Sequence, residues 1–123
     1  MDRPTRVNVL GIEYSIEYKD KPSEVDIFKR ESCWGQLDHW GRSIRVFDAG
    51  NRSAVDLLGV IVHELLHAME EELHLGVFDP KDDKEHKALD LLAKALIDSF
   101  VRSGWIDLPQ YWEPSKEDAD AVA

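Results

Sequence analysis

Hydrophobic and polar residues alternate in the first half of the chain, with the period of a half-buried β-strand. The alternation covers residues 6–18 and is interrupted at Leu10-Gly11, where we expect a tight turn or a bulge. Two shorter segments, residues 33–38 and Ser43–Phe47, predict two further strands. This half of the chain therefore predicts a small sheet.

The second half has the 3.6-residue period of amphipathic helices. A first helix is expected to begin after Ser53, which forms a capping pattern with Asp56, and to end near Gly76. Gly59 lies in the middle of this helix, where glycine costs about 1 kcal/mol relative to alanine. We therefore expect Gly59 to allow close packing against another element.

A second helix is expected from Asp82 to Ser103, followed by Gly104. Its predicted buried stripe consists of Leu89, Leu92, Ala93, Leu96 and Phe100. Strands followed by helices predict an α+β fold, with one domain at residues 1–108. Residues 109–123 contain prolines and several acidic residues and are expected to form an acidic, flexible tail.

The first helix carries the pattern His63-Glu64-x-x-His67. Residues four apart lie on the same face of a helix, so His63 and His67 can direct two imidazoles at one metal ion. Glu64 projects beside them, where it can reach a metal-bound water. Two histidine ligands with a glutamate as general base are typical of zinc metallopeptidases. The alternative interpretation is an amphipathic helix with two incidental histidines.

A catalytic zinc site needs a third protein ligand, and the second helix can provide it. Extending its hydrophobic stripe back from Leu89 by three or four residues reaches His86 and Glu85. Imidazole and carboxylate both bind zinc, and the two residues lie at similar angles from the stripe. Both therefore remain candidates for the third ligand. Asp82 and Asp90 are weaker candidates.

Composition limits the classes of function. The chain has 123 residues and a net charge of -10, which disfavours binding to a nucleic-acid backbone. Cys33 is the single cysteine, so an internal disulfide is excluded. No apolar stretch follows the first residues and none is long enough to span a bilayer, so we expect a cytoplasmic protein without a signal peptide or a membrane partner.

Taken together, these features resemble the small zincin-like metallopeptidases encoded in bacteriophages and prophages, which are related to the ImmA/IrrE and SprT-like groups. The matching segments are residues 9–18, 43–46 and 63–68, with Glu85-His86 ahead of Leu92-Ala93. The resemblance implies a minimal core in which a small, mostly antiparallel sheet packs on an active-site helix and a second, C-terminal helix, with Zn²⁺ between the helices. If the chain is phage-encoded, its location would be the host cytoplasm. The third ligand is glutamate in the gluzincin-like branches and histidine in the SprT-like branch.

The resemblance also implies a peptide or protein substrate that adds as a strand to the edge of the sheet, and Ser43–Phe47 is the edge strand we expect. The leading hypothesis is zinc-dependent peptide-bond hydrolysis with Glu64 as the base. Tyr14, His39 and Tyr111 are candidates for an additional donor to the developing oxyanion. The alternative is a non-enzymatic binding protein with a structural zinc that engages a host or phage protein.

Overall fold

The computed structural model describes residues 2–26, 34–77, 79 and 81–114. Within these residues the elements follow in the order β1 (Arg6–Val9), β2 (Ile12–Lys19), η1 (Pro22–Glu24), β3 (Gly35–Asp38), β4 (Ser43–Phe47), α1 (Ala54–Leu73) and α2 (Asp83–Arg102). Four strands and two long helices confirm the α+β class. Cys33, the first residue of a predicted strand, lies outside the described residues.

The break in the alternation at Leu10-Gly11 is a tight turn that joins β1 and β2 in an antiparallel hairpin. Leu10 and Gly11 both have positive φ, at 52° and 89°, as the two central residues of the favoured hairpin turns do. The side chain of Asn8 accepts a hydrogen bond from the Gly11 N–H at 2.7 Å, which stabilises the turn.

The four strands form one mixed sheet in the order β1-β2-β4-β3. β4 pairs with β2 in parallel and with β3 antiparallel, so both of its sides are hydrogen-bonded. The prediction that Ser43–Phe47 is an edge strand is therefore wrong. Alternation along a strand shows which of its faces is buried, but it does not show which strands lie beside it. The edges of the sheet are β1 and β3.

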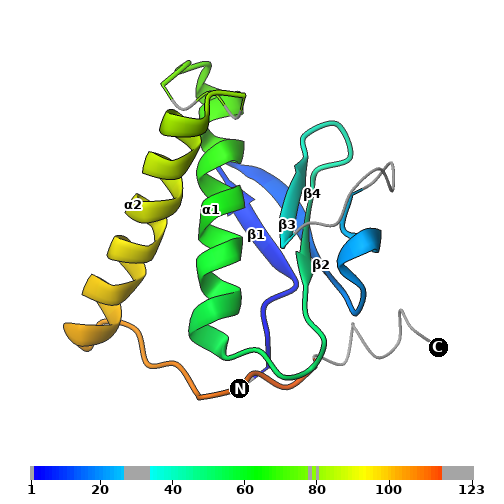
Figure 1. Ribbon diagram of the computed structural model, residues 1–123, viewed down its shortest axis with the longest axis vertical. Helices are drawn as coiled ribbons and strands as arrows, with labels where there is room; N and C mark the ends of the chain where they lie inside the picture. Colours follow the sequence, from blue (N-terminus) through cyan, green and yellow to red (C-terminus); the bar gives the residue numbers. More distant parts are fainter. Residues whose placement is uncertain (1, 27–33, 78, 80, 115–123) are drawn as a thin grey trace.

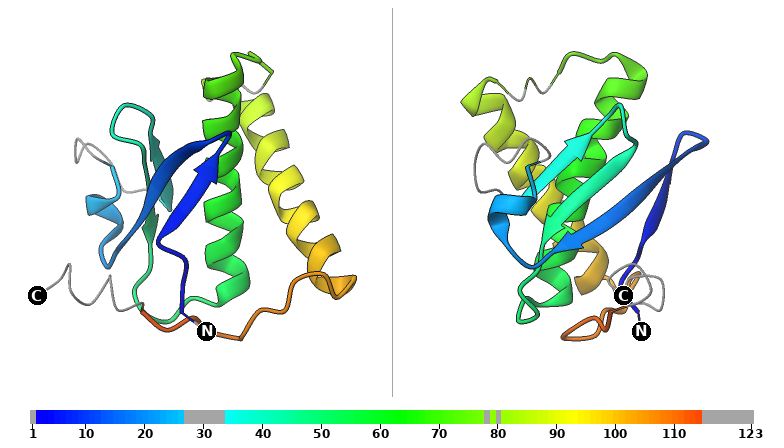
Figure 2. Two further views of the ribbon diagram at one scale, coloured as in Figure 1. Left: turned by 180° about the vertical axis from the view of Figure 1, so that it is seen from behind. Right: turned by 90° about the vertical axis from the view of Figure 1, so that its right-hand side faces the viewer.

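The structure has three layers, in which α1 covers one face of the sheet and α2 lies against α1 on the side away from the sheet (Figure 1). Two further views show the same arrangement (Figure 2). The main core lies between α1 and the sheet and is formed by Ile16, Ile44, Val46, Leu57 and Ile61. A second cluster, nearer the end of α1, contains Val9, Tyr14 and Ala68.

The start of α1 agrees with the predicted cap, because the Ser53 side chain accepts a hydrogen bond from the Asp56 N–H at 3.2 Å. The helix ends at Leu73, earlier than predicted, and His74 adopts the left-handed conformation of a C-cap. The expectation for Gly59 is wrong, since a Cβ at this position would meet nothing within 4 Å. Close packing therefore does not explain this glycine.

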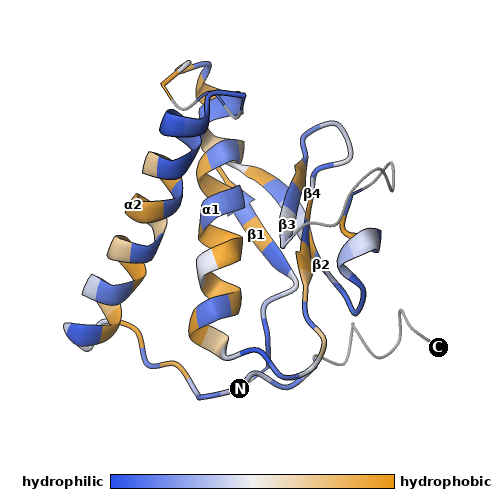
Figure 3. Ribbon diagram, viewed as in Figure 1, coloured by the Kyte–Doolittle hydropathy of each residue, from blue (hydrophilic) through white to orange (hydrophobic). Residues whose placement is uncertain are grey.

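Helix α2 buries a narrower stripe than its hydrophobic pattern predicts. Leu89, Ala93 and Ile97 are buried, whereas Leu92 and Leu96 are exposed, so the prediction of a wide buried face is wrong for these two leucines. The reason is that α2 packs mainly on one helix, α1, so a single line of residues spaced by four forms most of the contact. Hydrophobic positions nonetheless recur along α2 after its hydrophilic first turn (Figure 3).

The segment after α2 returns beneath the molecule and reaches the N-terminus (Figure 1). The Gln110 carbonyl accepts a hydrogen bond from the Ala54 N–H at 2.9 Å, and Glu113 accepts one from the Arg3 N–H at 3.0 Å. Trp112 packs against the main core. The first part of the predicted tail is therefore attached to the domain, and residues 115–123 lie outside the described residues. None of the described helices is long and apolar enough to cross a membrane.

Candidate metal centre

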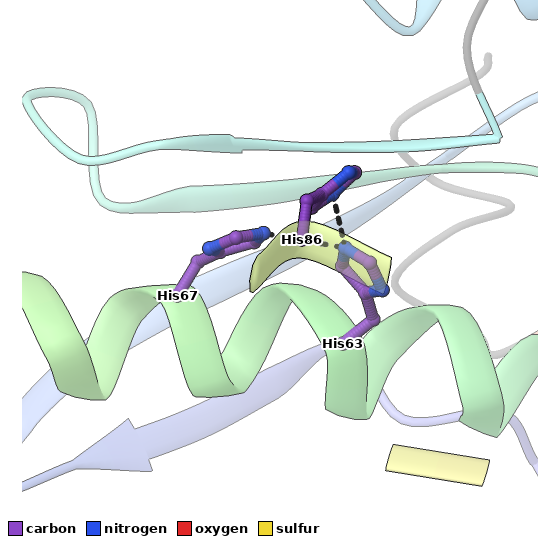
Figure 4. Close-up of side chains that lie close together, drawn as sticks. All are labelled: His63, His67 and His86. Carbon is purple, nitrogen blue, oxygen red and sulfur yellow. Dashed lines mark hydrogen bonds between the residues drawn. The ribbon is translucent and has the colours of Figure 1, made fainter. Parts of the chain in front are cut away.

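Three histidines from the two helices converge on one point (Figure 4). His63 and His67 project from successive turns of α1, and His86 projects from the first turns of α2. The Nε2 atoms of His63 and His86 are 2.9 Å apart, and those of His67 and His63 are 3.2 Å apart. One ring nitrogen from each residue lies within 4.8 Å of the others, so the cluster could hold a metal ion.

The geometry of the cluster fits a tetrahedral ion. Zinc binds imidazole nitrogen at about 2.0–2.1 Å, so two nitrogens on one tetrahedral ion are about 3.3 Å apart. Two of the three separations in the cluster, 2.9 Å and 3.2 Å, are close to that value, and the third is within 4.8 Å. Three protein nitrogens also leave one tetrahedral position for water or substrate, as catalytic zinc sites do.

Of the two candidates for the third ligand, the structure brings His86 to the cluster and places Glu85 elsewhere. The Glu85 carboxylate instead accepts a hydrogen bond from the Asp79 N–H at 3.1 Å, in the loop before α2. Asp82 is the N-cap of α2 and accepts a hydrogen bond from the Glu85 N–H. Successive helical residues point about 100° apart, and α2 meets α1 on the side where His86 lies.

The surroundings keep two of the imidazoles neutral, which is the form that binds a metal. Burial, with His63 and His86 close by, lowers the pKa of His67 to about 4. Burial also lowers the pKa of His63, although the Asp90 carboxylate acts in the opposite direction. At neutral pH both rings can therefore offer a lone pair without first releasing a proton.

Asp90 is not a ligand in this arrangement but lies directly behind one. Its Oδ1 is 3.1 Å from Nδ1 of His63, on the opposite side of the ring from the cluster. Burial acts to raise the pKa of Asp90, but the hydrogen bonds with Lys94 and His63 hold it below its ordinary value. An ionised carboxylate at Nδ1 fixes the proton there and turns the Nε2 lone pair toward the metal position.

Glu64 is buried beside the histidines, with 6 % of its surface exposed. Burial raises the pKa of its carboxyl to about 8. Its Oε2 has no hydrogen-bond partner among the described residues. A buried acceptor without a partner costs about 1–3 kcal/mol, so Glu64 is a poor choice for packing alone.

Glu64, His63 and His86 open into one cavity of ≈ 930 Å³ between α1, α2 and the start of β3. The edge strand β3 comes unusually close to α1 at this cavity. A Cβ on Gly35 would lie 2.5 Å from Cγ1 of Val60 and 3.4 Å from Cγ of Glu64. Any other residue at position 35 would force the Val60 side chain or the strand to shift.

The remaining candidates do not line this cavity within the described residues. Tyr14 is fully buried, and its hydroxyl donates to Glu72 at 2.8 Å, while His39 lies 3.3 Å from the same hydroxyl. Tyr111 lines a separate hollow near the N-terminus. His74, as the C-cap of α1, is outside the histidine cluster. The sequence-based choice of an oxyanion donor among these residues has no support from their positions.

Several residues around the cluster were not assigned their role from the sequence. Asp90 and Lys94 follow the candidate ligand His86 at intervals of four, so all three share one face of α2, and this spacing was a usable signal. The unexplained glycine at position 59 was a second signal, since Gly59 also lines the cavity. Gly35 has no comparable signal, because its closeness to Val60 depends on how β3 and α1 meet.

Comparisons of the chain with protein-family models, with curated proteins and with solved structures gave no match. The chemistry of this cluster is therefore the basis for the function proposed below.

Proposed function

We propose that the protein is a zinc-dependent peptidase, in which His63, His67 and His86 bind the zinc ion and Glu64 is the general base. The single observation that carries this proposal is the common cavity. Two imidazoles of the three-histidine group, those of His63 and His86, open into the same space as the buried Glu64 carboxyl group, whose Oε2 has no hydrogen-bond partner among the described residues. A zinc site that only stabilised the fold would need the histidines but would gain nothing from burying Glu64.

A zinc ion held by these three imidazoles would lower the pKa of a bound water molecule to about 7 and polarise a substrate carbonyl group. Glu64, whose ionised form the charge of a nearby zinc ion would favour, would accept a proton from the water as the water oxygen bonds to the peptide carbonyl carbon. It then donates this proton to the amide nitrogen as the carbon–nitrogen bond breaks. Asp90 holds the His63 ring in place through Nδ1 during both steps.

The substrate is an extended peptide that lies along β3 rather than along β4. β3 is an edge of the sheet, and its first residue, Gly35, lines the cavity together with Trp34. A peptide added to this edge would form backbone hydrogen bonds with β3 and pass over the histidines and Glu64. Trp34, with 63 % of its surface exposed, lies at the same opening, where the Arg52 guanidinium stacks over one face of its ring.

The test compares the zinc-loaded wild-type protein with Glu64→Gln on a mixture of unfolded proteins, with the products identified by mass spectrometry. Glutamine keeps the shape of the side chain but cannot accept the proton, so cleavage should fall by about 10²- to 10⁴-fold. Glu71→Gln, at an exposed position of the same helix, is the matched control and should cleave normally. Equal cleavage by wild type and Glu64→Gln would contradict the proposal.

One observation favours a second function, a binding protein whose zinc fastens the two helices together. Helix α2 buries only three side chains among the described residues, Leu89, Ala93 and Ile97, so a metal shared by His63 and His86 would strengthen a thin interface. In this case Glu64→Gln would leave the biological activity intact, whereas His86→Ala would release α2. The buried carboxylate of Glu64 favours the first function.

A further inference from the structure

The cavity at the histidines continues as a groove between α1 and α2. It runs from His63 toward the start of α1, where Val55 lines it, and toward the end of α2, where Val101 lines it. A helix rises 1.5 Å per residue, so Val55 lies about 12 Å from His63 along the axis. The groove therefore extends well beyond the space that a metal ion and a water molecule need.

Beyond the histidines the exposed surface of this groove is more apolar than polar, although the charged side chains of Arg52, Asp56 and Asp98 also line it. Val55 and Val60 line it from α1, and Ile97 and Val101 line it from α2. Ile97 has 4 % of its surface exposed and lies at the bottom. Lys94 also lines the groove, but its ammonium group is paired with Asp90 at 2.9 Å. An apolar channel that opens at a reactive centre is suited to a hydrocarbon side chain.

Gly59 explains how the groove stays open. It lies in the middle of α1 without a positive φ, so the backbone does not require glycine there. A Cβ at Gly59 would meet nothing within 4 Å, so packing does not require glycine either. The residue lowers the stability of the helix and lines the groove. Because Gly59 has no side chain, the adjacent space in the groove stays free.

We propose that this groove receives a large apolar side chain of the substrate, such as leucine, methionine or phenylalanine, and that Gly59 sets the room for it. The inference rests on the proposed peptidase function, because the occupant is a side chain of the peptide bound at the zinc. It adds the substrate class: unfolded or extended peptides with a bulky hydrophobic residue close to the bond that is cleaved.

The test uses the zinc-loaded protein and a mixture of short synthetic peptides in which each position varies over all amino acids. The wild type should prefer large apolar residues at one position beside the cleaved bond. Gly59→Leu should lower kcat/KM for those peptides by about tenfold or more and shift the preference to small residues. Ala95→Leu adds the same side chain at an exposed position of α2 outside the groove, and should leave the preference unchanged.

Measurements of Tm and zinc content show whether each variant is folded and binds the metal. Gly59→Leu removes a helical glycine, so its Tm should rise by roughly 3–5 °C while the preference is lost. If Gly59→Leu does not fold, Val101→Phe fills the groove from the opposite wall and should have the same effect on the preference. A wild type without apolar preference, or a filled groove with the wild-type preference, overturns the inference.

A binding experiment distinguishes failure of the peptidase function from failure of the groove proposal. If no peptide is cleaved, the same mixture is equilibrated by dialysis against the wild type and Gly59→Leu, and the retained peptides are identified. Retention of peptides rich in large apolar residues by the wild type alone would support the groove without catalysis. Equal retention by both proteins, or none, would overturn it.

Discussion

The buried carboxyl of Glu64 makes a sharp prediction for the metal-free protein. Burial raises the pKa of Glu64 from its ordinary value of 4.5 to about 8. Because the folded pKa lies above the unfolded one, the folded state holds the proton more tightly. The stability from this group is fully present below pH 4.5 and is lost as the pH rises through 8.

The size of the effect follows from the two pKa values. One unit corresponds to about 1.36 kcal/mol, so the loss between pH 5.5 and pH 8 is on the order of 3 kcal/mol. Native proteins are stable by only about 5–15 kcal/mol, so this loss is large. Burial of His67 lowers its pKa to about 4, which acts in the opposite direction and costs stability as the pH falls below 6.5.

Comparing the wild type with Glu64→Gln isolates the contribution of the carboxyl group to stability, since both proteins contain the same histidines. Urea unfolding is followed through the fluorescence of the four tryptophans, with a chelator present, at several pH values from 5.5 to 8. Between pH 5.5 and pH 8 the stability difference between the two proteins should change by about 3 kcal/mol in favour of the glutamine variant. Glu71→Gln, an exposed change in the same helix, should follow the wild type. A difference between wild type and Glu64→Gln that does not change with pH would refute the reasoning.

Three further predictions concern the metal and the close approach of β3. His86→Ala should abolish stoichiometric zinc binding in calorimetry, whereas Glu85→Ala should retain it, and the reverse result would show that the third ligand is wrongly assigned. Asp90→Ala should weaken zinc affinity by about 10- to 100-fold in competition with a chromophoric chelator, and Asp90→Asn by less, because its amide oxygen still accepts from His63. Gly35→Ala should destabilise the protein by about 1–3 kcal/mol in urea unfolding, and Val60→Ala should relieve most of that cost, since the new Cβ would meet Val60 at 2.5 Å. If the effects of Gly35→Ala and Val60→Ala on stability simply add, the contact between the new Cβ and Val60 is excluded.

Local patterns predicted the elements of this fold well, because each is determined by residues close in sequence. The periods of two and 3.6 located the hairpin and both helices, and Ser53 located the start of α1. The order of the strands was not predictable in this way. The parallel pairing of β2 with β4 joins residues 28 apart, such as Ser15 and Ser43, and no local signal specifies it. The error over the edge strand follows from this.

The candidate site likewise combines residues that local spacing could place together with one whose position depends on long-range packing. His63, Glu64 and His67 lie on one helix, so their spacing was enough to place them together. The third ligand depends on how α2 is rotated against α1, which a hydrophobic stripe defines only to within about one residue. The stripe itself was predicted too wide, because Leu92 and Leu96 are exposed, and its true centre at Leu89 and Ala93 turns His86 toward the cluster.

Two glycines at the cavity act in opposite ways, and together they account for its shape. Gly35 brings the edge strand so close to α1 that a Cβ would collide with Val60, which places the strand beside Glu64. Gly59, one residue before Val60, leaves space that no neighbour fills. If the interface between β3, α1 and α2 served packing alone, larger residues at position 59 would bury more hydrocarbon and add stability. The closeness at one glycine and the openness at the other fit the proposed extended peptide, whose backbone would lie along β3 with one side chain directed into the groove.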